Sequence, residues 1–124
     1  MAGTLFLYLG SGLIMIWGIA HLVPTRSIVK GFGVISKENT LIITMEWIAE
    51  GLTMIFIGLL ILCVTLISGS ANSGSVVVYR LCFGMLVVLA VLSFFTGART
   101  SILPMKICPF VKLLVAASLI PNMV

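Results

Sequence analysis

The sequence predicts an all-α integral membrane protein in which four transmembrane helices form an up-down bundle. Of its 124 residues, 61% are hydrophobic and only 8% are charged, and the mean hydropathy is +1.34. A soluble domain carries about 25% charged residues, and a soluble fold of this composition would expose large apolar patches. The apolar residues fall into four stretches, each close to the roughly 20 residues that cross a bilayer core. Because lipid offers the backbone no hydrogen-bond partners, each stretch is expected to be a helix.

The first predicted span runs from about Thr4 to Val23. It ends before Pro24, because a proline pushes the preceding residue out of the helical region. No basic segment of the kind that begins a secretory signal peptide precedes its apolar run, which has the length of a full span. We therefore expect this segment to be retained as a membrane helix.

The later spans are separated by short polar segments. They are expected at about Leu41–Ile67, Val76–Gly97 and Ile102–Ile120. Short links make successive helices antiparallel neighbours, so residues 1–124 are predicted to form a single transmembrane domain. The one longer link, 24–40, is amphipathic and is predicted to lie along the membrane interface. Small residues recur at seven-residue spacing, as Gly3/Gly10, Ser11/Gly18 and Gly51/Gly58, a pattern that suits close helix contacts.

Basic residues are distributed unequally between the two ends of the predicted bundle. Four of them fall in the two links on one side: Arg26, Lys30, Lys37 and Arg99. The opposite link and both tails carry no lysine or arginine, and only Arg80 lies near that face. The positive-inside rule therefore predicts a multi-pass protein of the cell membrane, with the charged links in the cytoplasm and both termini outside.

Two carboxylates stand within the second span. Glu46 and Glu50 are four residues apart, about 40° around one helical face. Counted from Leu41 at about 1.5 Å per residue, Glu50 lies roughly 14 Å along the helix, near mid-membrane. An ionisable group at that depth faces the bundle interior and marks a site, and desolvation and like charge favour a shared proton.

The antiparallel order places four further polar side chains at comparable depths: His21, Arg99, Lys106 and Lys112. Counted from the charged end, Lys112 matches Glu50, and the shallower Lys106 matches Glu46. The two lysines are about 120° apart on their helix, so both cannot face the carboxylates equally. These six residues form the candidate site for a ligand or a proton.

Other interpretations of this cluster stay open. Glu50 and Lys112 can form a buried pair that only fixes the helix register. A metal site would combine His21, Glu46, Glu50 and Cys108, but the Glu-x-x-His pairs of di-iron bundles are absent, and we predict no metal and no cofactor. Three cysteines far apart in the sequence, without a C-x-x-C, indicate neither a disulfide framework nor a dithiol centre.

Several function classes are disfavoured. The net charge of +4 comes from seven basic residues scattered among apolar runs, so it does not indicate nucleic-acid binding. No G-x-S-x-G, H-E-x-x-H, P-loop or G-x-G-x-x-G motif is present, which disfavours an independent enzyme.

Several short motifs carry a family resemblance: Ile16–Thr25 (IWGIAHLVPT), Gly31–Gly33 (GFG), Met45–Gly51 (MEWIAEG), Thr96–Arg99 (TGAR) and Lys106–Pro109 (KICP). With its size and four spans, the chain resembles small prokaryotic four-helix membrane proteins, the nearest named group being the DoxX-like set. That resemblance implies an association with membrane redox or quinone chemistry. No redox motif accompanies it here, so no reaction is carried over.

Three functions follow as hypotheses. The first is a small-molecule, cation or proton binding or transport-related protein that uses the polar cluster. The second is an accessory or assembly subunit in which the same charges hold helices together, and the third is a quinone-linked membrane enzyme. A chain this short leaves little room for a private pathway, so we expect a homo-oligomer or association with another membrane protein.

Overall fold

The computed structural model describes all 124 residues and contains only helices and turns. Its long helices are α1 (Ala2–Leu22), α3 (Lys37–Ser68), α4 (Ser73–Phe95) and α5 (Leu103–Leu119). A short helix α2 (Thr25–Lys30) and two 3-10 turns, η1 (Gly97–Arg99) and η2 (Ile120–Asn122), complete the chain. Four helical segments are long and apolar enough to cross a membrane, which confirms the predicted fold class.

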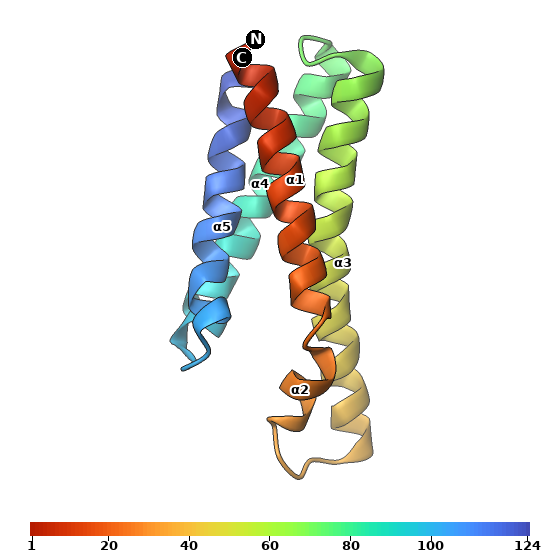
Figure 1. Cartoon of the computed structure of the whole chain (residues 1–124), viewed down its shortest axis with the longest axis vertical. Coiled ribbons are helices and arrows are strands. Elements are labelled where there is room, and N and C mark those ends of the chain that lie inside the picture. The colour runs from red at the N-terminus through yellow and green to blue at the C-terminus, as the bar shows by residue number, and fades with distance from the viewer.

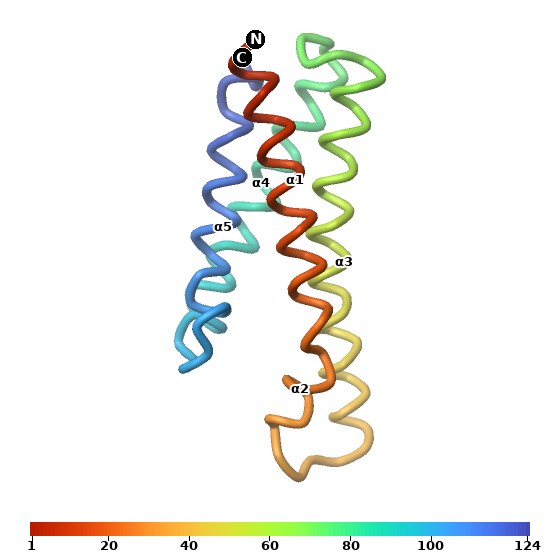
Figure 2. Tube along the Cα trace, viewed as in Figure 1, coloured from red at the N-terminus to blue at the C-terminus, as the bar shows by residue number.

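The long helices run alternately in opposite directions (Figure 1). Both termini lie at one end of the bundle, here called the terminus end, together with the α3–α4 link. The α4–α5 turn and the basic links lie toward the other end, here called the charged end. Helix α1 packs mainly on α3 and α5, and α4 packs mainly on α5. The Cα trace in Figure 2 shows the same up-down path.

Capping side chains move two helix starts toward the N-terminus of the chain. The Ser36 hydroxyl accepts a hydrogen bond from the Asn39 backbone N–H at 3.1 Å, and α3 begins at Lys37 rather than Leu41. The Asn72 side chain likewise accepts from the Gly74 backbone N–H, so α4 begins at Ser73. Hydropathy marks where a helix becomes apolar, whereas caps set where it begins.

The link between α1 and α3 contains structure that hydropathy did not reveal. Residues 25–30 form α2, which packs against the beginning of α3. Figure 1 shows α2 and the first turns of α3 extending past the ends of α4 and α5. The interfacial placement of residues 24–40 remains a prediction.

Small residues allow α1 and α3 to approach at backbone distance. A Cβ atom on Gly18 would lie 2.8 Å from the Gly51 carbonyl oxygen, and one on Gly58 would lie 2.8 Å from the Ser11 carbonyl oxygen. Any larger side chain at these positions would force the helices apart. The small residues Gly18, Gly51 and Gly58 therefore lie at the α1–α3 contact, whereas a Cβ on Gly3 or Gly10 would meet Asn122 or Ser118 instead. Close helix contacts at these small residues are as predicted.

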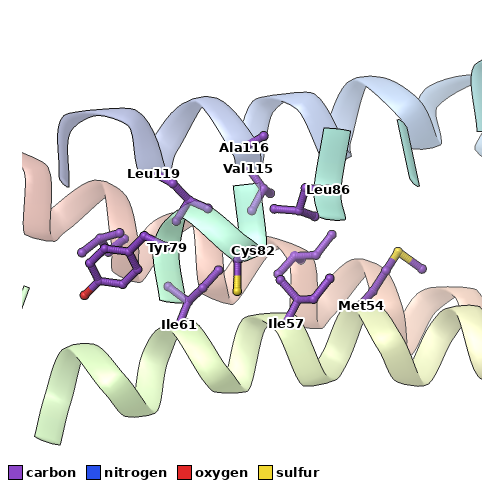
Figure 3. Packing of buried hydrophobic residues seen from close by; sticks show 11 residues of the cluster. Met54, Ile57, Ile61, Tyr79, Cys82, Leu86, Val115, Ala116 and Leu119 are labelled. Atoms are coloured by element: carbon purple, nitrogen blue, oxygen red, sulfur yellow. The ribbon is translucent and has the colours of Figure 1, made fainter. Parts of the chain in front are cut away.

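The apolar core occupies the half of the bundle nearer the terminus end. Eleven buried residues from all four long helices form one cluster, and Figure 3 shows most of them meeting between the helices. Only 24 of 124 residues are buried, and side chains such as Phe56 and Leu81 are 61% and 69% exposed. This outward apolar surface is what a lipid environment would cover.

Candidate functional site

The centre of the candidate site is an ion pair between α3 and α5. Lys112 donates to Glu50 Oε1 with an Nζ–Oε1 distance of 2.5 Å, and to the Ser93 hydroxyl at 2.6 Å. The Lys112 side chain is completely buried, whereas the Glu50 side chain is 28% exposed. The structure thus brings Glu50 to Lys112, as the antiparallel depths predict, and adds a partner from α4.

Helix direction explains why these groups meet. Side chains lean toward the N-terminus of their helix, and both α3 and α5 begin at the charged end, so Glu50 and Lys112 lean the same way. Ser93 donates its hydroxyl proton to the Leu89 carbonyl at 2.7 Å, which leaves a lone pair for the Lys112 ammonium. One lysine therefore connects α3, α4 and α5.

His21 lies on the other side of the same carboxylate. Its Nε2 is 3.8 Å from Glu50 Oε2, too far for a hydrogen bond, and has no other partner although it is buried. The imidazole stacks on the Trp47 ring with centroids 4.0 Å apart and planes at 13°. Trp47 in turn donates its indole N–H to the His21 carbonyl at 2.8 Å. The ring is thus held beside Glu50 without being bonded to it.

A second tryptophan, Trp17, lines the same hollow as His21. Trp17 donates its indole N–H to Cys108 Sγ at 3.4 Å and so connects α1 to α5. Both indole N–H groups are therefore used within the protein. Neither ring therefore has a free N–H donor, and only the apolar ring surfaces remain for contact with a ligand.

Three hollows meet near Trp47 at the charged end. The inner hollow, about 290 Å³, is bordered by Trp17, His21, Trp47, Met105 and Cys108 among others. The side hollow, about 500 Å³, is bordered by Glu46, Trp47, Glu50, Leu89 and Leu92 among others. The link hollow, about 580 Å³, lies between α2 and the α4–α5 turn. Trp47 and Met105 border all three, so the hollows adjoin one another.

The members of the polar cluster lie at different distances from the ends of their helices. Ser93, which bonds Lys112, is only two residues before Phe95, the last residue of α4. Depth counted from Leu41 places Glu50 near mid-membrane, but the first turns of α3 extend past the other helices (Figure 1). Lys112 lies nine residues after Leu103, the first residue of α5, which is about 14 Å along that helix. The depth of Glu50 in a membrane stays a prediction.

The structure does not add the other predicted side chains to this cluster. Glu46 borders the side hollow but is exposed and forms no ion pair. Lys106 is exposed and also unpaired, so its match in depth to Glu46 does not bring the two side chains together: Lys106 lies on the outer face of α5. Arg99 is exposed, with its guanidinium 5.8 Å from the centre of the Phe95 ring. Glu46 and Glu50 share a hollow but not a buried dyad.

Sequence reasoning missed Ser93. Its hydroxyl is the only polar side-chain group in the last three turns of α4, residues 85–95, and this isolation is the signal that could have found it. The open combination of His21, Glu46, Glu50 and Cys108 as metal ligands is not supported, because these side chains do not gather into a group that can hold an ion.

Chemically, the arrangement offers acceptors. Glu50 Oε2 and both oxygens of Glu46 carry no hydrogen bond from the protein, and the nearest cation, Lys112, is held by Glu50 Oε1 and Ser93. A cation or a hydrogen-bond donor in the side hollow would therefore find free carboxylate oxygens.

Comparison with protein-family models, curated proteins and solved structures finds no match to this chain.

Proposed function

We propose that this chain is a multi-pass membrane protein that binds a small molecule at the Glu50–Lys112 pair, in the charged half of the bundle. The observation that carries the proposal is the asymmetry of the pair. Lys112 is fully buried and bonded twice, whereas Glu50 is 28% exposed and has an unbonded oxygen beside a hollow of about 500 Å³. A pair kept only for structure gains most when every lone pair is satisfied.

The apolar core supports access from one side. In α3, α4 and α5 the turns that follow the polar cluster toward the terminus end carry Met54, Leu86 and Val115, each at most 1% exposed. No hollow continues through this packing from the cluster. The ligand would exchange with the charged end or with the surrounding lipid, which fits binding, or one state of a transport cycle, better than an open channel.

The orientation belongs to the same proposal. Arg26, Lys30, Lys37 and Arg99 lie on the links at the charged end. The positive-inside rule then turns this end, with its hollows, toward the cytoplasm and the termini outward. The site would take its ligand from the cytoplasm or from the inner leaflet.

A second candidate, an accessory subunit, is favoured by one observation. Lys112 joins α3, α4 and α5 through Glu50 and Ser93, which is the arrangement expected of a pair that fixes helix register. In that case the hollows would hold lipid only, and the same residues would matter for folding alone.

Native mass spectrometry of protein extracted with its own membrane separates the two candidates. The wild type should retain a small-molecule adduct that is absent from a folded Glu50→Leu/Lys112→Leu double variant, while phospholipid adducts persist in both. Glu38→Gln, which changes an exposed carboxylate in the first turn of α3, is the matched control. Identical adducts in wild type and double variant would favour the accessory subunit.

A further inference from the structure

We propose that the ligand of the side hollow is a lipophilic organic cation. This inference rests on the proposed function, because it names the chemical class that the Glu50 site would bind. It is carried by the charge of the lining residues, the apolar walls and the free carboxylate oxygens.

The charge that faces the side hollow is negative. Glu46 and Glu50 both line it, and no lysine, arginine or histidine does. Lys112, which does not line the hollow, pairs with Glu50 through Oε1 and leaves Oε2 without a hydrogen bond. Glu46 has no cation partner. A positive ligand is therefore the electrostatic complement of this lining.

The walls favour an organic cation over a metal ion. Apart from the carboxylates, the lining is largely hydrocarbon and indole, including Trp47, Leu89 and Leu92. The Thr53 hydroxyl donates its proton to the Ala49 carbonyl at 2.7 Å. Calcium takes about six to eight oxygen ligands, which this lining does not gather, and no metal-binding group is present. A cation with an apolar body would bury that body here and place its charge by the carboxylates and the indole ring.

The buried imidazole is a second observation that points to the same carboxylate. The His21 side chain is only 4% exposed, and its Nε2 lies 3.8 Å from Glu50 Oε2 and has no hydrogen-bond partner. A small shift of the carboxylate would let His21 bond it. His21 is therefore a buried polar group next to Glu50 that borders the inner hollow and not the side hollow.

Entry to the hollow requires no opening of the bundle. Four of its lining residues, Ile42, Glu46, Ala49 and Leu92, are exposed on the outer surface. Its volume of about 500 Å³ lies within the range of roughly 300–1,000 Å³ found for drug-sized ligands. A cation dissolved in the leaflet could therefore reach the carboxylates laterally.

Tetraphenylphosphonium is a suitable probe, and tetraphenylborate is its counterpart of the same shape and opposite charge. Equilibrium dialysis of the detergent-solubilised full chain should give saturable binding of the cation and none of the anion. Glu50→Gln should weaken binding about tenfold or more, the loss expected for one charged contact. Glu46→Gln, at an exposed and unpaired position, should weaken it without affecting the fold. Glu38→Gln should bind like the wild type.

Each other result overturns the inference. Equal binding of the cation by wild type and both hollow variants, or no binding at millimolar concentration, excludes a lipophilic cation. Binding of tetraphenylborate that depends on Glu50 would also exclude it, but would leave small-molecule binding at this site intact. Loss of the co-extracted adduct in the double variant, tested separately, decides the proposed function whatever the probe does.

Discussion

The two halves of the bundle use the same four helices differently. In the terminus half the helices converge on an apolar cluster in which Leu7, Ile61 and Tyr79 are fully buried. In the charged half, α4 and α5 diverge from α1 and α3 (Figure 1), and polar side chains and hollows occupy the space between them. The terminus half is thus closely packed, whereas the charged half contains the hollows on which the proposed function rests.

Hydrogen bonds reinforce the terminus half. Tyr79 and Thr65 share a buried hydroxyl–hydroxyl bond of 2.8 Å in the core. Asn122 donates to the Gly3 carbonyl at 2.9 Å, which ties the end of the chain to α1. Nothing equivalent joins α2 to the α4–α5 turn across the link hollow.

The largest expected effect comes from breaking the charged pair. Glu50→Leu leaves the ammonium of Lys112 buried with only Ser93, so it should lower the free energy of unfolding by about 3–5 kcal/mol. The Glu50→Leu/Lys112→Leu double variant should recover most of that loss, as measured by unfolding in detergent. If the double variant is no more stable than Glu50→Leu, the two side chains do not act as partners.

A cavity in the terminus half should affect stability alone. Ile61→Ala removes part of a fully buried side chain and should cost about 2–5 kcal/mol. Because Ile61 lies away from the side hollow, the folded fraction should bind tetraphenylphosphonium as the wild type does. If Ile61→Ala lost as much probe affinity as Glu50→Gln, the terminus half would also contribute to binding, which contradicts the proposed difference between the halves.

The two carboxylates should respond differently to the same change. Glu46 is exposed and unpaired, so Glu46→Gln should change stability by no more than about 0.5 kcal/mol. Glu50→Gln removes the charge that Lys112 bonds and should cost distinctly more. Thermal unfolding of both variants in one detergent measures the difference, and equal losses would mean that Glu50 is as solvated as Glu46.

Single-cysteine labelling, the change with the smallest expected effect, tests the orientation of the protein in the membrane. In a cysteine-free background that still folds, single cysteines at Ser36 and Ser73 should label from opposite sides of the membrane, with Ser73 accessible from outside. Both positions are exposed: Ser36 is the N-cap of α3 and Ser73 is the first residue of α4, at the opposite end of the bundle. Labelling of Ser73 only from the cytoplasmic side would reverse the proposed orientation and place the hollows outside.

Part of this structure follows from one-dimensional information. The four helices follow from hydropathy, and the Glu50–Lys112 pair follows from counting residues inward from one end of an antiparallel bundle. The presence of close helix contacts follows from the spacing of small residues such as Gly18 and Gly51, although the spacing does not say which helices meet. These features depend on length and period, which a sequence carries explicitly.

The remaining features depend on rotation and tilt of the helices. From the sequence, Lys106 and Lys112 are both candidates to contact the carboxylates. The rotation of α5 about its axis buries Lys112 and leaves Lys106 exposed. The stack of His21 on Trp47 depends on how closely α1 approaches α3. The extension of α3 beyond α4 and α5 at the charged end is likewise not recorded by a hydropathy window.

The central claim is that the unbonded oxygen of Glu50 faces a ligand in the side hollow. An experimental structure near neutral pH, with native lipids and small molecules retained, tests it most directly. We expect compact non-lipid density in the side hollow within hydrogen-bond or ion-pair distance of Glu50 Oε2, and its absence in Glu50→Gln. A hollow that holds only acyl chains in both proteins, with Glu50 fully bonded by Lys112 and His21, would contradict the account and leave the pair a structural one.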